Sequence, residues 1–591
     1  MDANRDTSLK RRNLLGAGLA FAGAAALPAA PAWAAGASRV RPGQPGWPTE
    51  AEWSSLGQAV GGRLSPVAQP KLDDPDARKL LANPFFIADQ PGLTETSGWL
   101  DAWRSQPSAY VVTAQSAADV AAAVRFASAH SLRLVIKGRG HSYFGASNAP
   151  DSLLIWTRHM DDVTVQDAFT PAGSSAAPVP AVSCGGGAMW LHAYDAVTTR
   201  GGRYVQGGGC TTVGVAGLVQ GGGFGSFSKA FGLAGASLLE AEVVTADGKV
   251  RVVSHAQEPD LFWALKGGGG GTFGVVTRLT LATHALPEIF GAVRLDLKAL
   301  SDEAYRRLLA RFVETSAANL VNPHWGEEVF TGPGNTFQVR MVTQGLTKAE
   351  LRAAWQPLID FAAANPADYQ GQDSFFAVTF PARLYWNPVV KPPGDILRDA
   401  RADATPGDFW WSGDAAQVGF FWHAFTSAWL PTSLLQPANQ ARFVDAWFAA
   451  SRHWGVQLQF SKGLAGATAD VLGVSRDTPM NPDVLDAFAL AIIADAGASL
   501  FTGAQPNVPF AQARAARVQT AMKALRAAAP DTGAYVNECD YFQPDWQRAF
   551  WGPHYARLLR IKRRYDPTGL FTGHHTVGSE GWSTDGFNRV D

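Results

Sequence analysis

Apolar and polar residues follow two different periods along the middle of the chain. Apolar residues recur at helical spacing in residues 302–320, 347–365 and 439–453. Between these stretches the apolar residues cluster or alternate as they do in strands, in residues 293–297, 336–342 and 456–460. This order predicts an antiparallel sheet that is covered on one face by helices.

The last of these strands has a distinct polar face. Residues 456–461 alternate Val, Leu and Phe with Gln457, Gln459 and a serine. Successive side chains of a strand point to opposite faces, so the three polar side chains share one face. Either that face lines a pocket, which makes Gln457 and Gln459 candidate substrate contacts, or it is the solvent side of an ordinary half-buried strand.

Glycine-rich turns surround two side chains that can form covalent bonds. His141 lies in residues 137–142, Lys-Gly-Arg-Gly-His-Ser, and Cys210 lies in residues 207–214, Gly-Gly-Gly-Cys-Thr-Thr-Val-Gly. Because glycine has no Cβ atom, such turns let the backbone close on a flat or phosphorylated ligand. Flexible linkers are polar and serine-rich, whereas apolar residues surround these turns. The pattern therefore predicts a ligand site that includes both side chains.

Five segments resemble, in the right order, the berberine-bridge-enzyme-like branch of the vanillyl-alcohol-oxidase family of flavoproteins. They are residues 107–120, 132–142, 214–250, 260–277 and 555–571. The resemblance implies a PCMH-type FAD-binding domain and one FAD, bonded to His141 at its 8α-methyl group and to Cys210 at C6. It also implies that a strand of the second domain roofs the flavin, so that the Gln457 and Gln459 face borders the substrate.

The resemblance implies further contacts with FAD. By their positions in the matching motifs, the expected cofactor-binding residues besides His141 and Cys210 are Lys137, Gly138, Arg139, Gly140, Ser142, Thr211, Thr212, Val213, Gly214, Gly217, Gly221, Gly222, Gly223, Gly225, Val275 and Asn537. Neither the cysteines nor the histidines have the spacing of a zinc or iron–sulfur site, so no metal is expected. The adjacent His574 and His575 would face opposite ways on an extended strand, which favours a structural role.

The resemblance places the catalytic residues in residues 535–541. The family carries Tyr-x-Asn-Tyr on its last strand, above the flavin; Tyr535 and Asn537 match, but Glu538 replaces the second tyrosine. A phenol has a pKa of about 10 and needs help to act as a base, whereas a carboxylate takes a proton directly. We expect Tyr535 to be the catalytic base, with Glu538 as the second candidate. The alternative is that Tyr535 is a structural strand residue.

A formal nucleotide motif has the wrong surroundings. Residues 269–274 match the dinucleotide fingerprint G-x-G-x-x-G, which requires a strand before it and a helix after it. Here residues 260–266 predict a short helix and residues 275–281 predict a strand. The order is reversed, and a Rossmann-type NAD site is excluded.

The N-terminus has the features of a twin-arginine signal peptide. Arg11 and Arg12 precede a weakly apolar segment that ends at Leu27, and residues 32–34, Ala-Trp-Ala, form a cleavage site. We expect export to the periplasm or the cell exterior, with the cofactor already bound. The alternative is an uncleaved anchor. No later segment has the length and apolarity of a membrane span.

Composition limits the possible partners. The 591 residues include 50 basic and 51 acidic side chains, a net charge of −1, so neither nucleic acid nor a charged membrane surface is indicated. This length favours two domains. Three cysteines are present; if Cys210 binds the flavin, Cys184 and Cys539 remain, and whether they pair is left open.

The extent of the motifs predicts the domain organisation and the fold class. We expect a signal peptide at residues 1–34 and a linker with an N-terminal extension at residues 35–104. The FAD-binding domain follows at residues 105–287, the substrate domain at residues 288–518, and a C-terminal return to the FAD-binding domain at residues 519–591. The fold class is α+β: a two-subdomain PCMH-type domain plus an α/β substrate domain.

Together these features predict an FAD-dependent oxidase. A hydride from the carbon of an alcohol or sugar hydroxyl passes to flavin N5, and O2 reoxidises the flavin and forms H2O2. Val213 matches the family position at which valine accompanies oxidase behaviour. The alternatives are a dehydrogenase that reduces a quinone, a ring-closing oxidase of secondary metabolism, and a flavin-loaded scaffold without turnover.

Overall fold

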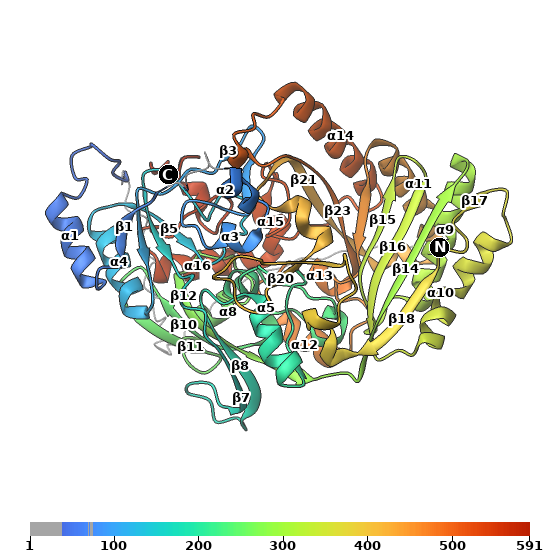
Figure 1. Cartoon of the computed structure of the whole chain (residues 1–591), viewed down its shortest axis with the longest axis horizontal. Helices are drawn as coiled ribbons and strands as arrows, with labels where there is room; N and C mark the ends of the chain where they lie inside the picture. The colour runs from blue at the N-terminus through green and yellow to red at the C-terminus, as the bar shows by residue number, and fades with distance from the viewer. Residues whose placement is uncertain (1–37, 69, 71–74, 591) are drawn as a thin grey trace, which may run out of the picture.

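The described chain forms two lobes and passes between them several times. The computed structural model describes residues 38–68, 70 and 75–590, so the predicted signal peptide lies outside the described residues. In Figure 1 the first helix of the described chain, α1 (Glu50–Ala59), lies in the left-hand lobe, the middle of the chain builds the right-hand lobe, and the chain returns to the left with α15 (Trp546–Trp551) and α16 (Tyr555–Tyr565). We call the left-hand part the first lobe and the right-hand part the second lobe.

Two sheets build the first lobe. In the first sheet, three parallel strands and one antiparallel edge strand lie in the order β1 (Leu64–Pro66), β4 (Tyr110–Thr113), β6 (Ser152–Trp156) and β5 (Arg133–Lys137). Helix α4 (Ala117–Ala129) packs on it and begins at Ser116, whose side chain accepts a hydrogen bond from the Asp119 amide at 3.2 Å. This cap is the Ser-x-x-Asp pattern of a helix start.

The second sheet of this lobe is antiparallel. Its order is β11 (Val250–Ser254), β10 (Leu238–Val244), β12 (Val275–Ala282), β8 (Val179–Gly185) and β7 (Val163–Phe169). Helix α8 (Pro259–Ala264) precedes the glycine run 267–271, and β12 follows it. The helix-then-strand order predicted around residues 269–274 is therefore confirmed.

One ten-stranded sheet forms the second lobe. Its order is β17 (Tyr369–Gln370), β14 (Ile289–Ala299), β16 (Thr336–Gln344), β15 (Trp325–Gly332), β22 (Val456–Gln459), β23 (Ala487–Gly497), β21 (Phe420–Pro431), β2 (Thr96–Trp99) and β3 (Trp103–Arg104), with β18 (Phe376–Pro381) beside β14. Only the β2–β21 pair is parallel.

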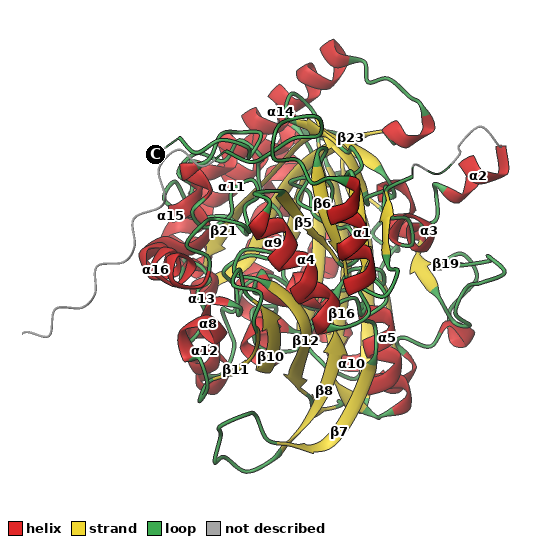
Figure 2. Cartoon of the chain, turned by 90° about the vertical axis from the view of Figure 1, so that its left-hand side faces the viewer, coloured by secondary structure: helices red, strands yellow, loops and turns green. Residues whose placement is uncertain are grey.

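Helices cover one face of this sheet, as predicted. They are α9 (Asp302–Asn319), α10 (Lys348–Ala363), α11 (Pro437–His453) and α14 (Val508–Arg526). Figure 1 shows α9, α10 and α11 at the right-hand end of the molecule, away from the first lobe, and Figure 2 views the molecule from the side of the first lobe. Their apolar side chains share a core with Ala428, Leu458 and Ala491 of the sheet. These elements confirm the α+β class.

The opposite face of the sheet looks toward the first lobe. Trp429 and Leu490 belong to a second core, which also contains Phe224 and Tyr535. Strand register places Trp429, Leu490, Gln459 and Glu328 in one row across β21, β23, β22 and β15. The polar face of β22 therefore looks toward the first lobe and not into bulk solvent.

Two segments differ from the expected division of the chain. Strands β2 and β3 come from the predicted N-terminal extension, yet they complete the sheet of the second lobe. Residue 519 lies inside α14, so the return to the first lobe begins after that helix ends at Arg526. The sequence pattern did not indicate either point, because both depend on long-range packing.

None of the three cysteines forms a disulfide. Cys184 and Cys539 are buried and do not pair with each other, while Cys210 is exposed. In the part of the chain that the structure describes, no helix combines the length and the apolarity needed to cross a membrane.

Candidate active site

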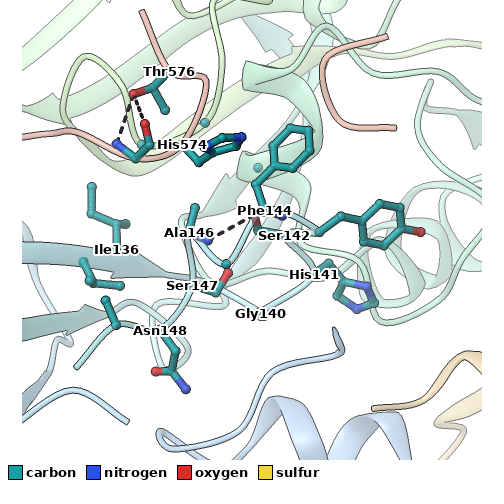
Figure 3. A pocket seen from close by; sticks show the side chains of 18 of the residues that line it. Ile136, Gly140, His141, Ser142, Phe144, Ala146, Ser147, Asn148, His574 and Thr576 are labelled. Atoms are coloured by element: carbon teal, nitrogen blue, oxygen red, sulfur yellow. Dashed lines mark hydrogen bonds between the residues drawn. The ribbon is translucent and has the colours of Figure 1, made fainter. Parts of the chain in front are cut away.

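A cavity of about 970 Å³ lies where the two lobes meet. The turn after β5 supplies residues 138–150 to its wall, and the start of α6 (Val215–Gln220) supplies Gly214 and Gly217. The 535–541 segment and residues 571–576 complete it. Figure 3 shows His141, Ser142, Phe144 and His574 around this space. A cavity of this size suits a large cofactor.

His141 enters the cavity wall from the turn that follows β5. Gly140 has a φ of +83°, a left-handed conformation that favours glycine, and it turns the chain so that His141 faces the Cys210 turn. The Nε2 atom of His141 lies 3.1 Å from Thr212 Oγ1. Burial, with Arg139 adding to it, lowers the pKa of His141 to about 4. The imidazole is therefore neutral at physiological pH, as a nucleophile must be.

Cys210 lies in the turn that precedes α6, and it is not among the residues that line the cavity. The carbonyl of Gly208 accepts a hydrogen bond from the Tyr194 hydroxyl at 2.8 Å, and the carbonyl of Gly209 accepts one from Trp411 Nε1 at 3.0 Å. Three residues later, Val213 lines the cavity. The Cys210 and His141 turns thus meet beside one space, joined by the contact of His141 with Thr212.

Three observations show that the cavity fits FAD. Arg139 is 3% exposed and donates its Nε–H to the Gly187 carbonyl at 2.7 Å, yet its Nη1 has no hydrogen-bond partner among the described residues. Arg133 adds a second guanidinium to the wall, and guanidinium groups bind phosphates well. A Cβ atom on Gly217 would meet no atom within 4 Å, which leaves room for a ligand against the helix start.

Several predicted cofactor contacts lie outside the cavity wall. Lys137 is buried and donates to the carbonyls of Gln90, Pro91 and Leu93 at 2.8–2.9 Å, so its side chain joins parts of the fold. Gly221, Gly222, Gly223 and Gly225 allow close packing instead: a Cβ on Gly221 would lie 2.2 Å from Asn537 Nδ2. Val275, Thr211 and Thr212 are buried next to the wall. The other predicted contacts from these loops line the cavity, except Cys210, which is not among its lining residues.

The 535–541 segment is a turn and not the expected strand. The Glu538 amide donates to the Tyr535 carbonyl at 2.9 Å, and this bridge folds the chain back on itself. Tyr535, Asn537 and Glu538 consequently all line the cavity, whereas on a strand Glu538 would face away from Tyr535 and Asn537. Asn537 Nδ2 donates to the Tyr535 hydroxyl at 3.0 Å.

Tyr535 and Glu538 have different surroundings. Tyr535 is 3% exposed, and burial followed by the charge of Glu538 raises the pKa of its phenol. Glu538 forms an ion pair with Lys462, which lies just after β22. No cation assists Tyr535 among the described groups that influence it. This arrangement favours Glu538 over Tyr535 as a proton acceptor.

Gln457 and Gln459 both donate side-chain hydrogen bonds to Oε2 of Glu328, the latter at 3.1 Å. Burial, reinforced by neighbouring Glu327, raises the pKa of Glu328 to about 7. Sequence reasoning missed Glu327 and Glu328, although two acidic residues inside the apolar strand 325–332 are a usable signal. It also missed Lys462 and Asp414, for which no local pattern exists.

Glu95 is a further buried carboxyl group near this site. It is 7% exposed, no described side chain donates a hydrogen bond to it, and burial raises its pKa to about 8. Its backbone joins two parts of the site, because its N–H donates to the Gly140 carbonyl at 3.0 Å and its carbonyl accepts from the Gly419 amide at 2.7 Å.

The Glu95→Gln variant is expected to gain stability at alkaline pH. The folded pKa of about 8 lies above the ordinary value of 4.5. The contribution of Glu95 to the stability of the folded protein is therefore fully present below pH 4.5 and is lost as the pH rises through 8. At pH 9 the charged wild-type group costs up to about 5 kcal/mol. Melting temperatures from pH 5 to 9 should diverge in favour of the variant, whereas exposed Glu303→Gln should leave them parallel. Parallel curves for Glu95→Gln would contradict the assignment.

His574 and His575 lie in a turn and not on an extended strand. Their rings therefore stack at 3.8 Å, contrary to the prediction that they face opposite ways. The ring of His574 also stacks on Tyr541 at 3.6 Å, and its Nε2 lies 2.6 Å from the Tyr541 carbonyl. Both rings line the cavity beside the 535–541 turn, and no metal-binding group occurs among the described residues.

Two protein-family profiles match the parts of the chain that build this site. The profile described as FAD binding domain matches residues 107–254. The profile described as Berberine and berberine like matches residues 534–578. The first segment contains the His141 and Cys210 turns, and the second contains the 535–541 turn and the paired histidines.

Individual proteins resemble the chain over nearly its whole length. The FAD-linked oxidoreductase notD' of Aspergillus versicolor is 30% identical over 93% of this chain and 90% of its own. The crystal structure of the VAO-type flavoprotein MtVAO615 from Myceliophthora thermophila C1 has a TM-score of 0.74 and 25% identity, over 93% of this chain and 99% of that one. A glucooligosaccharide oxidase from Acremonium strictum, described with a 6-S-cysteinyl, 8α-N1-histidyl FAD, has a TM-score of 0.65 and 19% identity, over 89% and 99%.

Proposed function

The chain belongs to the FAD-linked oxidoreductases of the vanillyl-alcohol-oxidase and berberine-bridge-enzyme-like family, and on this premise we propose that it is an oxidase of an alcohol or sugar hydroxyl group. One observation carries the proposal: the His141 turn, the Cys210 turn and the Tyr535–Glu538 turn all border the cavity between the lobes. Cofactor attachment and proton transfer are thereby brought to one place.

FAD is proposed to be bonded to both His141 and Cys210. The neutral His141 imidazole and the exposed Cys210 thiol are the nucleophilic side chains of the two glycine turns. Arg133 and Arg139 would hold the phosphates, and Gly214 and Gly217 would leave space for the backbone to approach. When bound, the flavin supplies the hydride acceptor.

Glu538 is proposed to accept the hydroxyl proton of the substrate, which revises the expectation that Tyr535 does so. Glu538 lines the cavity and lies beside Lys462. Tyr535, held by Asn537, would position the substrate. Proton transfer requires the base to reach the hydroxyl within hydrogen-bonding distance, and the 535–538 turn brings both side chains to the same wall.

The substrate is proposed to be a small-molecule alcohol or carbohydrate. Gln457, Gln459 and Glu328 form a polar group on the sheet face that looks toward the first lobe. Carboxylate and amide groups are suited to hydroxyl recognition. The glucooligosaccharide oxidase that shares the fold is consistent with this class. Aromatic side chains in the cavity wall, such as Tyr143 and Phe144, are consistent with an aromatic alcohol.

Oxygen is the proposed electron acceptor, and the twin-arginine route is the proposed path of export. Val213 lines the cavity at the family position associated with oxidase behaviour. Export with the flavin already attached agrees with a cofactor that cannot dissociate. A fluorescent fusion to residues 1–34 should leave the cytoplasm only when Arg11 and Arg12 are intact.

The proposal is tested by anaerobic addition of alcohols and sugars to the purified protein. An oxidase loses its flavin absorbance with at least one substrate, regains it on aeration, and releases H2O2. Reoxidation by a quinone with negligible H2O2 would identify a dehydrogenase instead. A flavin that no compound in a broad panel bleaches would indicate a catalytically silent scaffold.

A further inference from the structure

A segment of the second lobe reaches across to the Cys210 turn. It contains β19 (Ile396–Arg398), β20 (Phe409–Trp411) and the short helix η5 (Ser412–Gln417). Figure 1 shows β20 beside α5 (Trp190–Tyr194) of the first lobe. We call residues 382–419 the crossing segment. It contacts the first lobe at several places, among them Asp89, His192 and the backbone just before Cys210.

Aromatic side chains fix the backbone just before Cys210. Trp411 of the crossing segment donates to the Gly209 carbonyl at 3.0 Å, and Tyr194 of α5 donates to the Gly208 carbonyl at 2.8 Å. Trp386 stacks on Tyr194 with ring centroids 4.1 Å apart and planes 7° apart. The crossing segment therefore holds the Gly209 carbonyl directly through Trp411. It holds the Gly208 carbonyl indirectly, because Trp386 packs on Tyr194, which donates to that carbonyl.

The same segment brings a carboxylate to the thiol. Asp414 of η5 lies within hydrogen-bonding range of the Cys210 side chain, and its negative charge is the largest influence that raises the pKa of that thiol. Burial raises the pKa of Asp414 to about 6, so it is mainly ionised at neutral pH. A cation, Lys462, and a second carboxylate, Glu538, also act on Cys210. A thiol next to an ionised carboxylate keeps its proton at rest but has a proton acceptor at hand.

We propose that Asp414 is the proton acceptor through which Cys210 becomes bonded to the flavin, with Trp411 positioning the Cys210 turn for that reaction. The inference rests on the proposed double attachment of FAD. The thiol proton passes to Asp414 as sulfur forms a bond to flavin C6. The hydrogen on C6 leaves as a proton, and the two electrons of that C–H bond pass through the ring to O2, which becomes H2O2.

This role gives a reason for the contact between the second lobe, which is expected to bind substrate, and the Cys210 turn of the first lobe. Asp414 is far from Cys210 in sequence, and the hydrogen bond of Trp411 to Gly209 spans 202 residues. Attachment at Cys210 therefore requires both lobes to be folded and joined, whereas the His141 turn belongs to the first lobe, and no described carboxylate is among the groups that shift the pKa of His141. We expect the bond to His141 to form independently of Asp414.

The test compares flavin attachment in the wild type and in Asp414→Asn by mass spectrometry of the peptides that contain His141 and Cys210. In the variant the His141 peptide should carry flavin as in the wild type, while attachment to Cys210 during aeration of freshly expressed protein should be about 10²-fold slower. Asp414→Glu, which keeps a carboxylate, should attach faster than Asp414→Asn. Asp395→Asn is the matched control, because Asp395 lies in the same crossing segment but pairs at 3.8 Å with Arg294.

The outcomes separate this inference from the proposed function. Complete attachment to Cys210 at the wild-type rate in Asp414→Asn overturns the role of Asp414 and leaves double attachment standing. A wild-type protein whose Cys210 peptide carries no flavin overturns double attachment, and this inference with it. If Asp414→Asn fails to fold, Trp411→Phe supplies the second variant: slower attachment to Cys210 with an unchanged His141 bond supports the crossing segment's role, and an unchanged rate contradicts it.

Discussion

Replacing Glu538 with Gln is expected to slow flavin reduction by about 10²- to 10⁴-fold, because the variant has no carboxylate to take the substrate hydroxyl proton. Glutamine keeps the size and hydrogen bonding of the side chain, so substrate affinity should change little. The measurement is anaerobic stopped-flow bleaching of the flavin with an alcohol that the wild type oxidises. Covalent flavin content must equal that of the wild type, which separates catalysis from cofactor loading.

The matched control is Tyr535→Phe. This variant lacks only the hydroxyl group of Tyr535, which accepts a hydrogen bond from Asn537. Burial raises the pKa of the Tyr535 phenol, so the phenol stays protonated and is a poor proton acceptor. We expect a much smaller decrease than for Glu538→Gln. The reverse pattern, with rapid reduction in Glu538→Gln and a collapse in Tyr535→Phe, would assign the base to Tyr535.

Replacing Asp566 with Ala is expected to lower the free energy of unfolding by about 3–5 kcal/mol. Lys562 and Asp566 form a fully buried ion pair at 2.6 Å on and after α16. Lys562 also donates to the carbonyls of Thr272 and Phe571, and Asp566 accepts from the amides of Leu570 and Phe571. Removing the carboxylate leaves a buried lysine without its counter-charge, and Phe571 lines the cofactor cavity. The variant should therefore lose both stability and FAD content.

Chemical denaturation followed by tryptophan fluorescence measures this effect. The control is Asp445→Ala, which breaks an exposed ion pair with Arg306 at 2.5 Å and should cost less than about 1 kcal/mol. Equal losses in the two variants would show that the buried pair contributes no more than a surface pair does.

Much of the fold was predictable because its signals are local. The apolar residues have a clear helical or strand periodicity in α9, α10, α11, β14, β16 and β22. The helix-then-strand order around residues 269–274 also follows from neighbouring residues alone. The His141 and Cys210 turns were also found locally, since glycines surround each side chain. What unites these predictions is that none required knowledge of a distant partner.

The rest of the site depends on partners far apart in sequence. Lys462 meets Glu538 across 76 residues, and Gln457 meets Glu328 across 129. Such contacts follow from strand register and lobe packing, which no local pattern encodes. Lys137 illustrates the opposite error: its glycine-rich surroundings suggested a ligand, but the side chain satisfies three carbonyl groups inside the fold.

At residues 535–538 the motif was recognised correctly, but the conformation predicted for it was wrong. Tyr-Val-Asn-Glu matches a family segment that was expected to be a strand, in which Tyr535 and Glu538 would face opposite ways. The hydrogen bond from the Glu538 amide to the Tyr535 carbonyl closes a turn instead. Both side chains then reach the cavity, and Glu538 replaces Tyr535 as the preferred candidate for the catalytic base.

The most direct test of the account is acid precipitation of the purified wild-type protein, followed by absorbance of the pellet and the supernatant. We expect the flavin colour to stay in the pellet, to remain there in His141→Ala and in Cys210→Ala separately, and to move to the supernatant only when both residues are replaced. Flavin released from the wild type would contradict the double attachment on which the proposed site is built.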